Sequence, residues 1–402
     1  MQSQPSQSTY DIVIIGGAIM GSSAAWYLSQ APEFDGRILV VEKDMSYQAC
    51  ATAHTNSCIR QQFSSKLNIE MSQYTARFIS SLQAHMGGDP RVPNIDIHSF
   101  GYLYLSDNPT FSDTLKRDQT LQNSLGAATE ILSPDDIAAR YPFYDLTGID
   151  CGSLNTLNEG YWDGSTVFEW MRRKAMENGV EYIENRVVGM TRSASGDTIE
   201  TVTLASGEVI SCGTVLNATG PRAAQTARMA GIELPVEPRK RFTWVIKAET
   251  PLDRDLPLTI DPSGVHVREN GGGTYMVGGK SDLDHAVDPD DFDMDHSLWM
   301  DHIWPTLATR IPAFEAVKIQ SEWAGHYDFN VIDQNAILGP HPELSNLIFM
   351  NGFSGHGLQH APAMGRGISE LILHGAFRTL DLSPFSFDRL LDGTASSERA
   401  II

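Results

Sequence analysis

A short strand, a glycine-rich turn and a helix at the start of the chain constrain its fold more than any other feature. Residues 10–15 (YDIVII) are mostly apolar and β-branched, and the glycines of residues 16–21 follow at once. Residues 22–29 predict a helix and residues 37–42 (RILVVE) a second buried strand. Strand, turn, helix and strand within about 30 residues form a βαβ unit with a right-handed crossover.

The turn matches a dinucleotide-binding fingerprint. That fingerprint reads G-x-G-x-x-G, with an acidic residue about 20 positions further on that binds a ribose hydroxyl. Gly16 and Gly21 take the first and third glycine positions, Ala18 takes the second, and Glu42 follows 42 − 21 = 21 residues later. Such a turn aims backbone N–H groups and a helix N-terminus at a pyrophosphate. A nucleotide site is therefore predicted, and a tight turn without a ligand is the alternative.

Charge and composition exclude several classes of protein. The 402 residues include 29 Lys and Arg against 50 Asp and Glu, a net charge of −21 with His neutral. An acidic chain without a basic run repels phosphate backbones, so no nucleic-acid partner is expected. No stretch approaches the ~20 apolar residues that span a bilayer, so no membrane span is expected.

Cysteines and acidic residues predict no metal site. The four cysteines are widely separated: Cys50, Cys58, Cys151 and Cys212. They form no C-x-x-C pair and are expected to stay reduced in a cytoplasmic protein. Residues 1–8 predict a loose polar tail without a signal-peptide pattern. Residues 282–295 are rich in aspartate, but their spacing fails the calcium-loop pattern, so a solvated loop and no metal are expected.

Two further patterns separate FAD from NAD as the nucleotide. Residues 216–220 (LNATG) end a buried strand with the A-T-G sequence that recurs in FAD enzymes. Residues 352–359 (GFSGHGLQ) form a second glycine-rich turn before a helix. Close backbone approach there suits a flat ring edge or an oxygen that needs N–H donors. A simple NAD-dependent dehydrogenase has no need of such a site, so FAD is the expected cofactor.

These stretches together resemble the D-amino-acid oxidase superfamily of FAD enzymes, and within it the sarcosine and glycine oxidase branch. The similarity covers nearly the whole chain. It implies an α/β fold: a Rossmann-like FAD-binding domain, with a parallel sheet and helices, and an inserted antiparallel-sheet substrate domain. The FAD-binding domain is expected to be discontinuous, in residues 9–91, 150–225 and 325–392. The substrate domain is expected in residues 92–149 and 226–324.

The resemblance also implies which residues bind FAD. Glu42 would hold the adenosine ribose, and Val187 would meet the adenine through its backbone. The residues expected at the nucleotide end are Gly16, Ala18, Gly21, Glu42, Lys43, Val187, Ala218 and Gly220. Those expected at the flavin pyrimidine end are Gly355, His356, Gly357, Leu358 and Gln359. His54 is a candidate covalent link, because its surroundings resemble such a histidine in dimethylglycine-type dehydrogenases, but non-covalent FAD is the main expectation.

Substrate-binding residues follow from the same resemblance. Arg60 matches an arginine on the flavin face that would hold an amino-acid carboxylate as a bidentate pair. A surface arginine is the alternative. Tyr327 resembles an active-site tyrosine and His326 is its neighbour, although either side chain could instead serve packing. His266 and Tyr275, on paired strands, are expected to face the site from above.

Two departures from the family pattern concern the flavin. Sarcosine oxidases attach FAD through a cysteine near the position of Tyr327, and this chain has none there. Oxidases of this branch also place an oxygen-activating lysine at a position that matches Met276, with Lys280 close by. The departure favours a dehydrogenase that passes electrons to an acceptor other than oxygen.

The implied activity is that of an FAD-dependent amine or amino-acid oxidase or dehydrogenase. The expected reaction oxidises a C–N bond of a small secondary or N-substituted amine or amino acid to an imine, by hydride transfer to flavin N5. The amine must first lose its proton. Two alternatives stay open: a flavin-bound assembly or interaction factor with little turnover, and an NAD-dependent dehydrogenase.

Overall fold

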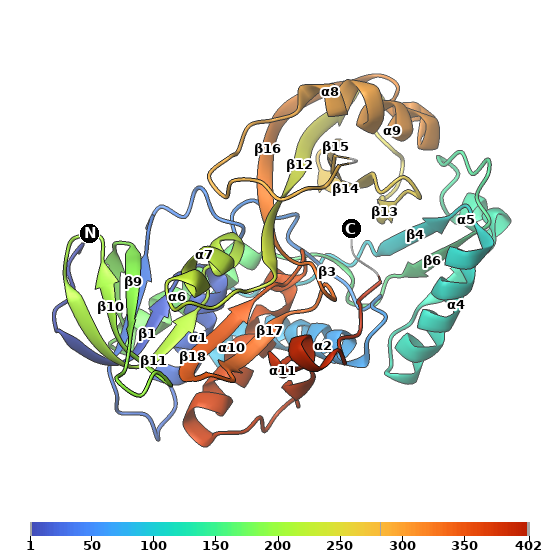
Figure 1. Ribbon diagram of the computed structural model, residues 1–402. Helices are drawn as coiled ribbons and strands as arrows, with labels where there is room; N and C mark the ends of the chain where they lie inside the picture. The colour runs from blue at the N-terminus through green and yellow to red at the C-terminus, as the bar shows by residue number, and fades with distance from the viewer. Residues whose placement is uncertain (1, 282, 400–402) are drawn as a thin grey trace.

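Two large sheets organise the chain, whose computed structural model describes residues 2–281 and 283–399 (Figure 1). The first sheet has the strand order β17-β18-β11-β1-β2-β8, and β10 pairs with β11 and β9. Its strands are β1 (Thr9–Ile15), β2 (Ile38–Glu42), β8 (Glu181–Glu184), β9 (Val187–Arg192), β10 (Ile199–Leu204), β11 (Val209–Asn217), β17 (Ile337–His341) and β18 (Leu344–Asn351). The path from β18 to β8 is parallel, whereas β17, β10 and β9 pair in antiparallel fashion.

The parallel strands are buried on both faces, which explains their continuous apolar sequence. In β1, Ile12 and Ile14 enter one core, and Val13 and Ile15 enter the core on the opposite face. The first core also holds several residues from each of the helices α1 (Ile19–Ser29), α2 (Lys66–Ser80), α6 (Gly164–Glu177) and α10 (Gly357–His374). The second core is covered by α7 (Ala223–Arg228) together with β9 and β10.

The second sheet is mostly antiparallel and has the order β16-β12-β15-β14-β13-β4-β6-β5. Its strands are β4 (Tyr102–Ser106), β5 (Glu130–Leu132), β6 (Cys151–Asn155), β12 (Val236–Ala248), β13 (Leu258–Ile260), β14 (His266–Gly271), β15 (Thr274–Gly279) and β16 (Val317–Asn330). Only the pairing of β13 with β4 is parallel among the strand pairs described in this sheet. A separate ribbon joins β3 (Cys58–Ile59) to β7 (Gly160–Tyr161).

The remaining helices complete the described part of the chain. They are α3 (Leu82–His85), α4 (Pro109–Ser124), α5 (Pro134–Arg140), α8 (His296–Leu298), α9 (Trp304–Arg310) and α11 (Asp388–Asp392), with the single turns η1 (Gly220–Arg222), η2 (Trp299–Ile303), η3 (Pro312–Phe314) and η4 (Ser383–Phe385). None of the helices in residues 2–281 and 283–399 has the length and apolar character to cross a bilayer.

The expected α/β fold, with a parallel sheet covered by helices and an antiparallel sheet, is confirmed. The expected domain boundaries stay a proposal. The expected first domain includes residues 150–225 and 325–392. In the structure, however, β6 and the whole of β16 belong to the second sheet. Residues 2–8 hydrogen-bond to the first sheet: the Ser6 hydroxyl donates to Glu181 (2.6 Å), and the carbonyl of Ser8 accepts from Ser211.

Candidate functional site

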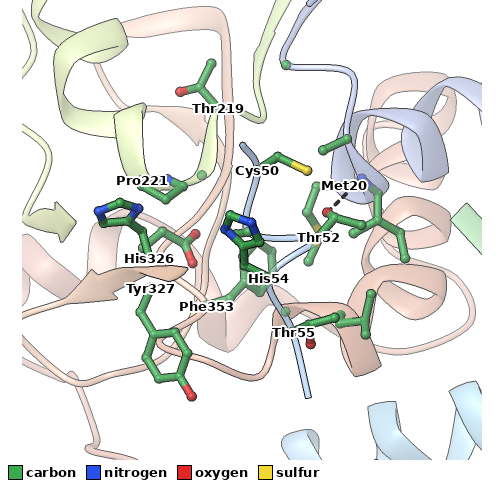
Figure 2. A pocket seen from close by; sticks show the side chains of 18 of the residues that line it. Met20, Cys50, Thr52, His54, Thr55, Thr219, Pro221, His326, Tyr327 and Phe353 are labelled. Atoms are coloured by element: carbon green, nitrogen blue, oxygen red, sulfur yellow. Dashed lines mark hydrogen bonds between the residues drawn. The ribbon is translucent and has the colours of Figure 1, made fainter. Parts of the chain in front are cut away.

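A cavity of about 500 Å³ is lined by residues of both sheets. All of the predicted site residues line it except Gly21 and Tyr275. Figure 2 shows His54 on its loop across from His326 and Tyr327, which neighbour each other on β16. Among the described residues, no group of three or more His, Cys, Asp or Glu could hold a metal ion.

The glycine turn at the end of β1 allows three backbone segments to meet. Gly16 has φ +96°, and an added Cβ would lie 2.5 Å from the carbonyl oxygen of Ala218 at the end of β11. A Cβ on Gly21 would overlap the carbonyl oxygen of Gly16, so Gly21 packs α1 onto the turn without lining the cavity. The N-terminus of α1, after its N-cap Ala18, therefore reaches the cavity edge. A helix N-terminus is a position that favours an anion.

Glu42 lies at the neighbouring strand end. Its carboxylate accepts hydrogen bonds from the backbone N–H of Gly17 (2.8 Å) and of Asp44 (3.1 Å), and burial raises its pKa. The adjacent Lys43 lines the cavity and pairs with Asp290 (3.2 Å). Three further predicted residues line this end of the cavity: Val187, Ala218 and Gly220.

The second glycine turn leads into α10, whose N-terminus also lies at the cavity. Gly355 has φ +94°, and a Cβ there would overlap ring atoms of Tyr327. His356 is buried, and burial, with a smaller contribution from Arg60, lowers its pKa to about 3. Neither of its ring nitrogens has a hydrogen-bond partner among the described residues. The side chain of Gln359 instead accepts from the backbone N–H of Arg60 (2.9 Å).

Four predicted substrate residues lie in the same cavity. Arg60 is only 5% exposed, which excludes a surface arginine, and its guanidinium lies 4.4 Å from the ring centroid of Phe63. His266 is held 3.1 Å from the amide nitrogen of Asn56, and burial, then the neighbouring arginines, lower its pKa to about 4. His326 and Tyr327 both line the cavity from β16.

Tyr275 lies elsewhere. Its hydroxyl accepts from the backbone N–H of Leu252 (2.9 Å), and its ring packs 4.5 Å from that of Phe314 in the core of the second sheet. His266 on β14 pairs with Gly278 on β15, and Gly278 is an odd number of positions from Tyr275 along that strand. Because alternate strand residues face opposite sides of a sheet, Tyr275 points away from His266. The expectation that Tyr275 faces the site is therefore not met by the geometry.

Three of the cavity residues that were not predicted shape the site through their contacts. The Arg241 guanidinium lies 4.6 Å from the ring centroid of Tyr327 and pairs with Asp284. Phe292 comes from the aspartate-rich stretch and packs against His326. Asp328 accepts from the backbone N–H of Gly352 (2.8 Å), and burial raises its pKa to about 6. Only Arg241 had a sequence signal, since it closes the basic triplet of residues 239–241.

FAD fits these features. Two glycine turns with no room for side chains, and two helix N-termini, face one cavity that reaches from Glu42 to His356. Buried ring nitrogens at that cavity lack protein partners in the described residues, as expected where a bound group supplies hydrogen bonds. His54 is one of them: its Nδ1 has no partner, and a Cβ on Gly325 would lie 2.9 Å from the His54 Cβ.

Comparison with known proteins gives consistent results. A family model described as "FAD dependent oxidoreductase" (DAO) matches residues 11–371. FAD-dependent oxidoreductase domain-containing protein 1 of Xenopus laevis is 35% identical, covering 98% of this chain and 85% of that protein. The mitochondrial sarcosine dehydrogenase of Mus musculus is 24% identical over 93% of this chain and 40% of its own length. The L-proline dehydrogenase from P. horikoshii superposes with a TM-score of 0.81 at 25% identity, covering 98% of this chain and 99% of that one.

Proposed function

The chain belongs to the DAO family of FAD-dependent oxidoreductases, and we propose that it oxidises a C–N bond of a small secondary or N-substituted amine or amino acid to an imine. The family, the FAD cofactor and the class of enzyme acting on CH–NH groups are confirmed by the comparisons. The named relatives include a sarcosine dehydrogenase and an L-proline dehydrogenase, which supports a secondary amine as substrate.

Bound FAD supplies the two-electron acceptor for the C–N bond. The residues proposed to hold it are those at the two glycine turns. The N-termini of α1 and α10 would stabilise negative charge on the pyrophosphate and on the flavin ring. Glu42 would accept hydrogen bonds from the adenosine ribose. Binding is proposed to be non-covalent, with His54 as the residue to examine if the flavin stays attached after denaturation.

The chain's own groups would position and deprotonate the substrate. Arg60 would pair with a substrate carboxylate, because a guanidinium offers two parallel N–H donors. The guanidinium of Arg241 lines the same cavity, and a nearby cation lowers the pKa of a bound ammonium group. His266 is neutral at pH 7, because burial first of all lowers its pKa to about 4, so it adds no positive charge beside the substrate amine. Orientation by these groups lets the neutral amine react.

One observation carries the proposal: a buried arginine, a tyrosine and a neutral histidine line the same cavity as the two glycine turns. This arrangement supports catalysis better than a flavin-bound factor, for which a sealed or apolar cavity is expected. We propose that the electrons pass to an acceptor other than oxygen, because a methionine stands at position 276, where oxidases of this branch have a lysine. A cytoplasmic location is proposed from the four cysteines, which are free.

The test is an absorption spectrum of the purified protein before and after anaerobic addition of N-methyl and cyclic amino acids. Flavin bands that bleach with one amine are expected, with slow recovery in air. The matched variant Arg60→Lys keeps the charge but loses the bidentate pair, so it should raise KM for the substrate amino acid more than it lowers kcat. Bands that never bleach across the panel would instead support a flavin-bound assembly factor, and a colourless protein would return NAD as the nucleotide.

A further inference from the structure

Residues 284–293, here called the strap, lie along the FAD cavity. Their aspartates were expected in a solvated loop, but the structure attaches them to both sheets. At one end the backbone N–H of Val287 donates to the carbonyl of Pro238 on β12 (2.9 Å). Further along, Pro289 and Phe292 line the cavity. In Figure 1 this part of the chain reaches from the second sheet toward α7. The strap therefore joins the two halves of the molecule at the cavity.

The aromatic contact of the strap is with the two histidines of the cavity wall. The Phe292 ring lies edge-on to His326, with 4.6 Å between ring centroids, and to His54, with 5.5 Å. Both histidines line the cavity. Each has one buried ring nitrogen without a hydrogen-bond partner among the described residues. Phe292 thus covers a stretch of the cavity wall that carries two buried ring nitrogens, His54 Nδ1 and His326 Nε2.

The base of the strap is held firmly. The Asp284 carboxylate pairs with the Arg241 guanidinium at 2.7 Å, and the two side chains are only 13% and 9% exposed. Asp291 pairs with Lys240 at 2.5 Å, and Lys240 also donates to the carbonyl of Asp293 (2.9 Å). These cations all come from β12, so this part of the strap is bound to its own sheet.

The tip of the strap crosses to the other half of the molecule through Asp290. Its carboxylate pairs with Lys43, which follows β2 (3.2 Å), and with Arg222 in η1. Arg222 also donates to the carbonyl of Pro289 (3.3 Å). The Asp290 side chain is 60% exposed, so water and salt compete for these pairs. A base held on β12 by two ion pairs, of which the Asp284 pair is buried, and an exposed tip are the arrangement of a cover that opens at one end.

We propose that the strap is a releasable cover of the FAD cavity. Its base stays on β12 through Asp284 and Asp291. Its tip is latched by Asp290 to Lys43 and Arg222, and Phe292 closes the wall between His54 and His326. Breaking the latch lets the tip swing away and the cofactor enter or leave. The proposal rests on the proposed function only in that FAD occupies this cavity.

The test compares FAD release from Asp290→Asn with release from the control Asp288→Asn. Both changes remove one negative charge from the strap. Asp288 makes no ion pair among the described residues, and its carboxylate oxygen accepts only the local N–H of Asp290 (2.8 Å), which an asparagine oxygen also accepts. FAD-loaded protein is diluted, and the return of free flavin fluorescence is followed with time. Asp290→Asn should release FAD about two- to fivefold faster than the control, as expected for an exposed latch.

Salt provides a second readout. Raising the ionic strength from about 0.01 M to about 1 M shortens the Debye length from about 30 Å to about 3 Å, which weakens the latch. Release should therefore accelerate with salt in the wild type and in Asp288→Asn, but little in Asp290→Asn. Equal release rates and equal salt dependence in the two FAD-loaded variants would refute the proposal that the strap is a releasable cover, and would leave the proposed function untouched. A protein that binds no FAD in either form would overturn the proposed function as well.

Discussion

Gly355 is the position where one added methyl group should disturb the flavin end of the site most directly. It has φ +94°, a region that favours glycine, and it lies against the ring of Tyr327. The ideal Cβ of an alanine would overlap that ring, well inside the 3.0 Å that real Cβ atoms keep. Gly355→Ala must therefore pay for both an unfavourable backbone conformation and the displacement of Tyr327.

The two costs can be separated with a control. A non-glycine residue in the left-handed region costs about 1–2 kcal/mol, and overpacking of a well-packed site costs about 1–3 kcal/mol more. Gly375, which ends α10, has φ +69° but nothing within 4 Å of its added Cβ. Gly375→Ala should therefore show the backbone cost alone. The expected difference between the two variants is the overpacking term, about 1–3 kcal/mol.

Urea unfolding of both variants measures this difference, provided that the slope of the transition is unchanged. Gly355→Ala should also bind FAD more weakly, whereas Gly375→Ala should bind it like the wild type, because Gly355 lines the cavity and Gly375 does not. If Gly355→Ala proves as stable as Gly375→Ala and retains FAD equally well, the close packing of the turn on Tyr327 does not constrain the site.

Two pH dependences follow from buried groups. Burial raises the pKa of Glu159 to about 8 from 4.5, so between these values the folded protein keeps a proton that the unfolded chain has lost. Stability should therefore fall as pH rises through that window, by up to about 1.4 kcal/mol per pH unit, and urea unfolding of Glu159→Gln should lack this slope. Burial lowers the pKa of His266 to about 4 from 6.5, so acidification through that range protonates only the unfolded chain and should destabilise the fold. In urea unfolding at a series of pH values, His266→Gln should lose less stability between about pH 6.5 and about pH 4 than the wild type does. An equal loss in the variant and the wild type would contradict a neutral buried His266.

The nucleotide end of the site could be predicted because its parts are local in sequence. The turn glycines, the helix and Glu42 all fall within residues 10–42, and their spacing alone fixes a βαβ unit. The structure adds why Gly21 matters: it lets α1 pack on the carbonyl of Gly16. The second glycine turn was recognised for the same reason, since it lies directly before a helix. Its contact with Tyr327, 28 residues earlier in the chain (355 − 327 = 28), could not be derived from composition.

Substrate-side positions depended on strand register, which the sequence leaves open. His266 and Tyr275 lie on neighbouring strands joined by a glycine-rich turn, so they were expected to face the same side. The register pairs Glu269 with Tyr275 and His266 with Gly278, which places Met276 and Gly278, not Tyr275, on the face of His266. A shift of one residue reverses every side chain of a strand. Turn length and irregularity near Asn270 decide that shift, and neither follows from residue type alone.

The aspartate-rich stretch shows a different limit of the sequence. Its charges alone predict a solvated loop, because acidic residues favour water. Lys280 pairs locally with Asp284, but the other cations that bind the stretch are Lys43, Arg222 and the triplet at residues 239–241, which lie between about 40 and 250 positions away. Three consecutive basic residues are too few to form a nucleic-acid patch, and in the structure this triplet binds the aspartate-rich stretch. Neither the acidic stretch nor the distant cations predict a contact when each is considered alone. Together, their opposite charges determine where these segments of the chain meet.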